Sequence, residues 1–182
     1  MKNLHCISLL LLALCLSSCG SSKKVEKSPI KTFVMPCSEL VSGNGVLRAW
    51  ASGRSDNETA ARKKAQAAAA AELAAMLSRT VEATTEDYTT ALSGANRSES
   101  RSLLNDKVKI SVNETLKGAT IACDRWTHDE ATGQYTNYIV MELQGEEFLK
   151  ILYETLGSSR QIDRELLRKL FMENIDKSAK KE

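Results

Sequence analysis

The chain has 182 residues, which is enough for one ordinary domain with appendages and leaves little room for two. Its 25 basic and 23 acidic side chains give a formal net charge of +2, so the sequence lacks the basic excess expected of a nucleic-acid-binding protein. Aromatic residues make up 5% of the chain and there are two prolines, which argues against a proline-rich scaffold and against an aromatic-lined carbohydrate cleft.

The first residues have the pattern of a bacterial lipoprotein signal. A positive start precedes an apolar run over residues 7–16, which is shorter than the roughly twenty residues that a membrane-spanning helix needs. The run ends in Leu16-Ser17-Ser18-Cys19, which resembles a lipobox. We therefore predict a signal peptide over residues 1–18, a diacylglycerol thioether plus an N-acyl chain on Cys19, and no other cofactor. A plain secretory signal with an incidental cysteine is the alternative.

The residues after Cys19 indicate where the protein is anchored. By resemblance to the sorting of Gram-negative lipoproteins, Gly20, rather than an aspartate, favours the outer membrane. Residues 19–40 are predicted to be the lipidated cysteine and a flexible tether, because their first part is small and charged and shows no apolar period. No acidic run follows Cys19, so we predict that the domain faces the periplasm.

Five cysteines reduce to two in the processed chain. Cys6 and Cys15 lie in the predicted signal and Cys19 would be acylated, which leaves Cys37 and Cys123. In an oxidising envelope a disulfide between them is plausible; it would close a loop of about 85 residues, worth roughly 4 kcal/mol by chain entropy. Two buried or unpaired thiols are the alternative. We expect no metal site, because the remaining cysteines and histidine show no ligand spacing.

The body of the chain begins with a predicted strand and a long helix. Residues 45–53 alternate between two faces and are bounded by glycines, which is typical of a strand. Residues 57–92 have the best helix-forming composition, with Ser55 predicted as N-cap and Glu58 reaching back in a capping box. Its alanines are expected to pack closely on a sheet, although a partner-helix stripe or low complexity is also possible.

Residues 99–117 have two conflicting patterns. Apolar residues at four-residue steps from Leu104 to Leu116 indicate a helix, whereas the alternation around Ile110 indicates a strand. The length and the four-residue spacing favour a helix that ends at Gly118.

Two β-rich runs and two helical stretches complete the chain. Residues 119–127 and 134–143 are predicted to form a hairpin, and a helix then runs from residue 145 to Gly157. The predicted fold is therefore α+β, a small three-stranded antiparallel sheet packed by long helices in the order β-α-α-β-β-α-α. We assign residues 41–157 to this domain.

Residues 158–182 are predicted to form a separate amphipathic helix and a charged tail. The predicted apolar side consists of Ile162, Leu166, Leu170 and Phe171, and fraying is expected beyond Ile175. This helix either docks a partner or an anionic membrane surface, or packs on its own domain or a neighbouring copy.

The sequence offers little catalytic chemistry. It contains no phosphate-binding glycine loop, and His128 lies in the predicted hairpin loop, far in sequence from any candidate serine. We therefore do not predict an enzyme. The residue types suited to binding are Arg125, Trp126, Tyr135 and Tyr138, an aromatic and guanidinium group able to stack on a ligand or a partner. Cross-strand packing is the favoured explanation of these four side chains, and binding is the alternative.

Several elements in order resemble the LPP-twenty lipoprotein family, and the arrangement is similar to the amino-terminal domain of flagellar assembly protein T. The matching features lie between Leu47 and Leu143: Gly53 in the first strand, the pair Leu73-Ala74 near the end of the alanine-rich helix, Leu116 and Gly118, then Gly133, Tyr135 and Glu142. The resemblance implies a compact α/β domain on a lipid anchor without known catalytic residues. The carboxy-terminal helices extend beyond that pattern.

Together these features predict a non-catalytic envelope lipoprotein that acts as a protein-interaction or structural module, with an envelope protein or a second copy as partner and no nucleic acid. The alternative is a ligand- or cell-wall-binding lipoprotein that uses the surface of Arg125, Trp126, Tyr135 and Tyr138.

Overall fold

The computed structural model describes residues 34–92, 96–158 and 162–179. The predicted signal, Cys19 and residues 20–33 lie outside this range. The elements are β1 (Val46–Ser55), α2 (Glu58–Ala91), α3 (Asn96–Leu116), β2 (Thr120–Asp129), β3 (Gln134–Gln144), α4 (Gly145–Leu156) and α5 (Arg164–Ala179). The strands form one antiparallel sheet in the order β1-β3-β2. The predicted fold class and element order are confirmed.

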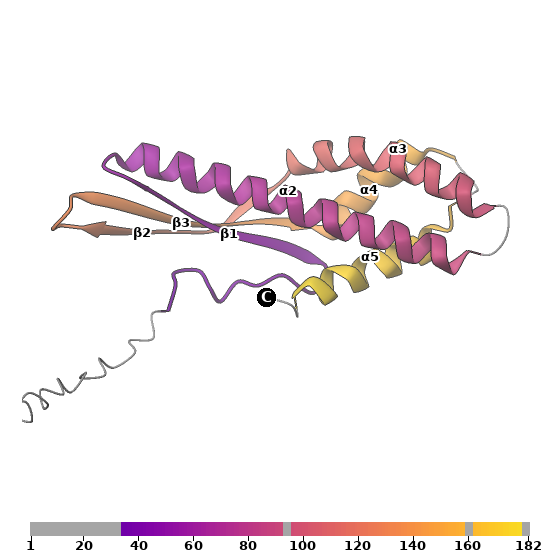
Figure 1. Cartoon of the computed structure of the whole chain (residues 1–182), viewed down its shortest axis with the longest axis horizontal. Helices are drawn as coiled ribbons and strands as arrows, with labels where there is room; N and C mark the ends of the chain where they lie inside the picture. Colours follow the sequence, from indigo (N-terminus) through magenta and orange to yellow (C-terminus); the bar gives the residue numbers. More distant parts are fainter. Residues whose placement is uncertain (1–33, 93–95, 159–161, 180–182) are drawn as a thin grey trace, which may run out of the picture. The chain divides into compact units, whose positions relative to one another are not determined.

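The sheet has two unlike faces. One, which we call the helix face, carries Leu47, Ala49 and Ala51 of β1 together with Ile139 of β3, all buried beneath α2. The other, the outer face, carries Trp50 and Tyr138, which are half-buried. Figure 1 shows α2 running along the sheet and continuing past it to the remaining helices. α2 packs mainly on β1 and β3.

The alanines of α2 allow a very close approach to β1. Ala61, Ala65 and Ala69 are fully buried against the sheet. A Cβ atom added to Gly53 would lie 2.3 Å from the carbonyl oxygen of Ala61 and 2.4 Å from the nitrogen of Ala65. The strand therefore needs glycine at this point because the helix backbone occupies the space that a side chain would fill.

The second half of α2 packs in a helical core with α3, α4 and α5 (Figure 1). The largest side chains there are Tyr88, Leu104, Phe148 and Phe171, and the rings of Phe148 and Phe171 stack with centroids 4.8 Å apart. Several buried hydroxyls bond within their own helix, as Thr84 does by donating to the Thr80 carbonyl at 2.7 Å. Such bonds let polar side chains enter an apolar core without unpaired donors.

α3 confirms the helical interpretation of residues 99–117. Leu104 and Val112 face the core, while Ile110 is 53% exposed. Ser111 and Thr115 are also buried, and each hydroxyl donates to the carbonyl four residues earlier. The alternation around Ile110 therefore does not mark a strand, because Ile110 lies on the solvent side of the helix.

The start of α2 differs from the prediction. Asn57 is the N-cap, and its Oδ1 accepts a hydrogen bond from the Ala60 nitrogen at 2.9 Å. Ser55, predicted as the cap, is the last residue of β1, and its hydroxyl donates to Asp56. The predicted capping box with Glu58 is wrong because the strand extends two residues further than its glycine boundary suggested.

Asn57→Ala is expected to lower the free energy of unfolding by about 1 kcal/mol, since it removes the acceptor of an exposed helix-start N–H. Ser55→Ala is the matched control, and its effect should stay within about 0.5 kcal/mol. Urea unfolding of both variants, followed by circular dichroism, measures the difference. Equal losses would contradict the assignment of Asn57 as the cap.

α5 is part of the core, and its buried side is rotated from the predicted one. Leu167, Phe171 and Ile175 are buried, whereas Leu166 and Leu170 are half-buried. The helix continues to Ala179 instead of fraying at Ile175. It packs on α2 and α4, as one of the predicted alternatives stated, so the boundary at residue 158 does not separate an independent segment.

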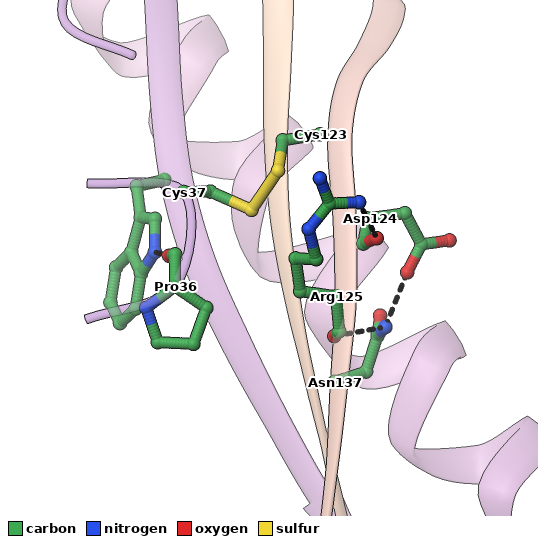
Figure 2. Close-up of a disulfide and its surroundings, with 7 residues drawn as sticks. Pro36, Cys37, Cys123, Asp124, Arg125 and Asn137 are labelled. Carbon is green, nitrogen blue, oxygen red and sulfur yellow. Dashed lines mark hydrogen bonds between the residues drawn. A yellow bond between two sulfur atoms is a disulfide. The ribbon is translucent and has the colours of Figure 1, made fainter. Parts of the chain in front are cut away.

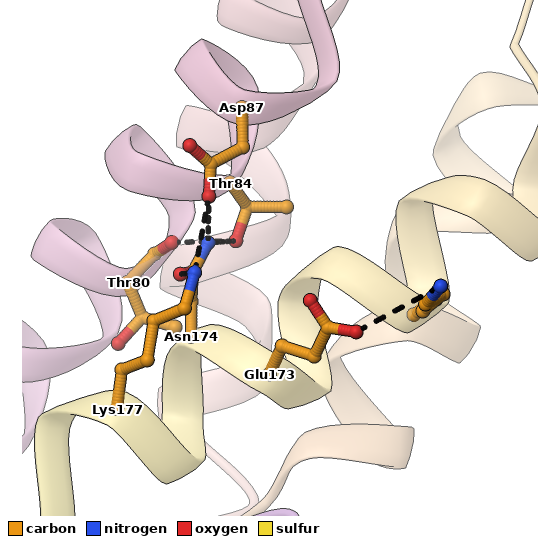
Figure 3. Close-up of polar contacts among 7 residues, drawn as sticks. Thr80, Thr84, Asp87, Glu173, Asn174 and Lys177 are labelled. Carbon is orange, nitrogen blue, oxygen red and sulfur yellow. Dashed lines mark hydrogen bonds and ion pairs between the residues drawn. The ribbon is translucent and has the colours of Figure 1, made fainter. Parts of the chain in front are cut away.

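A polar cluster fixes α5 on α2. The Asn174 amide donates to the Thr84 hydroxyl at 3.2 Å and to Asp87 at 3.1 Å, and the Lys177 ammonium donates to the Asn174 Oδ1 at 3.1 Å (Figure 3). Asn174 is 7% exposed, so its bonds form where water competes little. They explain why asparagine occupies a buried position that the apolar pattern could not identify.

Residues 34–40 differ from the predicted flexible tether, because the segment lies against the outer face of the sheet. Cys37 is 3% exposed and joined to Cys123 of β2 by a disulfide, with the two Cα atoms 6.0 Å apart. The Trp50 indole donates to the Pro36 carbonyl at 3.0 Å (Figure 2). The folded unit therefore begins at Val34 and includes the last part of the segment that was predicted to be tether.

Candidate functional site

The four residues predicted as a binding surface fall on two faces of the hairpin. Arg125 lies opposite Tyr138, and both belong to the outer face. Trp126 lies opposite Asn137 and Tyr135 lies opposite His128, and these belong to the helix face. Consecutive strand residues point to opposite sides, so Arg125 and Trp126 cannot join one cluster. The structure therefore pairs Arg125 with Tyr138 on one face, sets Trp126 and Tyr135 opposite other residues on the other face, and does not form the predicted group of four.

On the outer face, Tyr138 lies beside Trp50 of β1, with ring centroids 6.2 Å apart. The Cys37–Cys123 bond and Val140 form a small buried cluster next to Trp50. Beyond the disulfide, towards the hairpin loop, Arg125 is exposed. Sequence reasoning missed Trp50 as a member of this surface, although strand alternation already placed it on one side of the first strand.

On the helix face of the hairpin, Trp126 is 36% exposed. The ring of His128 stacks on Tyr135 with centroids 4.4 Å apart. His128, predicted in the loop, lies near the end of β2, because β2 runs to Asp129. α2 packs mainly on β1 and β3, so Trp126 and His128 lie on β2, the strand beyond its main contacts.

Asp124 connects β2 to the rest of the domain. Its carboxylate pairs with Arg62 of α2 at 2.9 Å and accepts from the Asn137 amide at 2.6 Å, while that amide also donates to the Arg125 carbonyl at 3.1 Å (Figure 2). Asn137 is fully buried, and its Oδ1 has no hydrogen-bond partner among the described residues. These contacts join β2 to β3 through Asn137 and to α2 through Arg62.

The described hollows lie between or beside the helices and along β1. A groove of about 640 Å³ separates Glu82 and Glu86 of α2 from Arg101 and Lys109 of α3. Smaller hollows of about 470, 380 and 320 Å³ lie beside α4 at the start of α5, beside the edge of β1, and between α2 and α5. None of the described hollows is lined by the four predicted residues. Trp50, the neighbour of Tyr138 on the outer face, does line the hollow beside β1.

The shifted ionisable groups have local structural causes. Burial raises the pKa of the Tyr88 and Tyr153 hydroxyls. The Thr132 hydroxyl, together with backbone N–H groups, lowers the pKa of Asp129 and orders the turn after β2. Among the described residues, no group of three or more His, Cys, Asp or Glu side chains is placed to hold a metal ion. None of the described helices has the length and apolar character needed to cross a bilayer.

Comparison with known proteins found no matching family model, curated protein or solved structure. The resemblance to the LPP-twenty family therefore rests on the sequence features given above.

Proposed function

We propose that the chain is a lipoprotein anchored in the bacterial outer membrane through Cys19, facing the periplasm, and that its domain acts without catalysis as a protein-interaction or structural module. The observation that carries the proposal is the lipobox Leu16-Ser17-Ser18-Cys19 after a short apolar run. A disulfide between Cys37 and Cys123 fits an oxidising compartment, where such bonds form and persist. The exposed Trp126 on the hairpin supports a role in contact with another protein.

Cys19→Ala is expected to abolish labelling with a palmitate analogue and to move the protein from the membrane to the soluble fraction, because the change removes the thiol that takes the lipid. Cys15→Ala is the matched control, since it alters a neighbouring cysteine that does not follow the lipobox. Cell fractionation and metabolic labelling measure both. A Cys19→Ala protein that stays labelled and membrane-bound would contradict the proposed anchor.

The ligand- or cell-wall-binding alternative has one supporting observation: Arg125 and Tyr138 lie opposite each other on the outer face, beside Trp50. Co-sedimentation with purified peptidoglycan separates the two functions. Binding that is lost in Tyr138→Ala and kept in Trp126→Ala would favour the alternative, whereas no binding by the wild-type chain would leave the interaction module as the better proposal.

A further inference from the structure

The two edges of the sheet differ in how their backbone groups are used. On β1, the Ser42 hydroxyl both accepts from the Arg48 nitrogen at 2.9 Å and donates to the Arg48 carbonyl at 3.1 Å. Gly43 and Val46 bond each other's backbone, and the Lys64 ammonium donates to the Arg54 carbonyl at 3.0 Å. The edge of β1 is therefore occupied at both ends by the protein's own groups, which protects an edge against pairing.

On the edge of β2, fewer outward backbone groups are bonded to the rest of the protein. The backbone groups of Arg48 on β1 point away from β3, which fixes which residues of β3 bond to β1 and which bond to β2. By the same alternation on β2, the backbone N–H and C=O groups of Asp124, Trp126 and His128 point away from β3. Within the described part of the chain, the one bond to these outward groups is from the Arg125 guanidinium to the Asp124 carbonyl at 3.3 Å. Three successive outward residues thus offer donors and acceptors to an additional strand.

The side chains of β2 also suit pairing. Trp126 and Ile121 are 36% and 39% exposed, and both lie on the helix face, where α2 makes its main contacts with the other two strands. A new strand beside β2 would cover part of the Trp126 ring, which gives an apolar contribution beyond the backbone hydrogen bonds. The bulge at residues 121–123 limits regular pairing to the part of β2 that follows it.

The sequence of this edge is complementary to itself. With a two-fold axis at Trp126, antiparallel pairing sets Trp126 opposite Trp126 of the second copy and Asp124 opposite His128. The imidazole can donate to the carboxylate, and the two indole rings become neighbours across the junction. Arg125 falls opposite Thr127, with Asp129 of the second copy on one diagonal and Arg125 on the other. The Arg125 guanidinium reaches the Asp129 carboxylate of the second copy when its side chain leans along that diagonal.

The geometry of such a pair agrees with anchoring in one membrane. A two-fold axis between antiparallel strands of one sheet is perpendicular to the sheet, so both copies present the same face on the same side. The two segments 34–41 then lie on one side of the joined sheet, and the two α2 helices lie on the other. Both chains can therefore reach a single bilayer from the side on which they enter their domains.

We propose that β2 pairs antiparallel with β2 of a second copy, centred on Trp126, so that two sheets join into one. This proposal rests on the interaction function proposed above, and it adds the surface, β2, and the partner, a second copy of the chain. The contact involves one strand from each copy, which places it among small and reversible interfaces.

Cysteine pairs test the register directly. One copy carries Arg125→Cys and a co-expressed second copy carries Thr127→Cys, two positions that the proposed pairing sets about 4.5 Å apart at Cα, within disulfide range. The matched control uses Ser52→Cys with Arg54→Cys, which are also exposed, two residues apart and on the outer face, but on β1. We expect a disulfide-linked dimer in cells from the β2 pair only. A dimer from the β1 pair, or from neither pair, would overturn the proposal.

A proline at the outward position His128 tests the backbone contribution. His128→Pro and His128→Ala both remove the imidazole, but only proline removes the outward N–H, which is not bonded to β3. Sedimentation equilibrium of the purified mature chain in detergent is expected to show dimers that His128→Ala weakens and His128→Pro weakens by about tenfold more. Equal effects of the two changes would contradict pairing through the edge.

The outcomes separate this inference from the proposed function. A membrane-anchored wild-type chain that remains monomeric up to millimolar concentration would overturn strand pairing and leave the anchored module intact. A wild-type chain that is absent from the membrane fraction but still forms the β2 crosslink would overturn the proposed anchor and leave strand pairing intact. Crosslinks from Thr127→Cys to other proteins without any to a second copy would assign this edge to a different partner and overturn self-pairing.

Discussion

Replacing both Cys37 and Cys123 with alanine is expected to lower the free energy of unfolding by about 4 kcal/mol. The bond joins residues 86 apart in sequence, so the loop it closes contains β1, α2 and α3. Closing such a long loop costs the unfolded chain much conformational entropy. The disulfide keeps the loop closed in the unfolded state, so it lowers the entropy of that state and favours folding. Denaturant unfolding of the purified mature chain under non-reducing conditions measures the effect.

Two controls separate the bond from the side chains. Wild-type protein unfolded in the presence of a reductant should approach the stability of the double variant, because it keeps the sulfur atoms but loses the bond. Ser38→Ala, an exposed neighbour of Cys37, should change stability by less than about 0.5 kcal/mol. A double variant within 1 kcal/mol of the oxidised wild type would show that the bond does not constrain the unfolded chain in this way.

Phe171→Ala is expected to destabilise the protein by about 3–5 kcal/mol, since it empties a site in the helical core where Phe171 stacks on Phe148. Phe171 is 1% exposed, and its neighbour Leu170 is half-buried. Leu170→Ala is therefore the matched control and should cost clearly less. Thermal and urea unfolding followed by circular dichroism compare them. Similar losses at both positions would contradict the rotation of α5 seen in the structure.

The order of elements was predictable because each has a strong local pattern. The alanine-rich run from residue 57 and the β-rich runs on either side of the predicted loop at 128–133 each have one dominant period, and the four-residue steps of residues 104–116 indicate the helix α3. The buried side of α5 was not predictable to the residue. Leu166 and Leu167 are chemically identical neighbours, and the choice between them depends on where α5 meets α2, including the buried Asn174.

The location of the four predicted residues on the hairpin was predictable, but their division between its two faces was not part of the prediction. Arg125, Trp126, Tyr135 and Tyr138 all lie on the hairpin, yet strand alternation divides them. The division between faces can be predicted from strand alternation alone. The cross-strand partner of each residue can be predicted only if the register is known, and the bulge before Cys123 shifts that register. Trp50 joined the surface through pairing of strands distant in sequence, and no local signal marks such a contact.

The Cys37–Cys123 bond has a further consequence if Cys19 carries the lipid: it sets the length of the tether between the lipid and the folded domain. Residues 20–33 then connect the bilayer to the domain and span at most about 50 Å when fully extended. Releasing residues 34–41 from the sheet would extend that limit to about 80 Å. Because accessible volume grows with the cube of the reach, the bond confines the domain to about a quarter of the space it would otherwise sweep. In a lipid-anchored chain, this single covalent link would therefore set an upper limit to the height above the bilayer at which the domain can meet a partner.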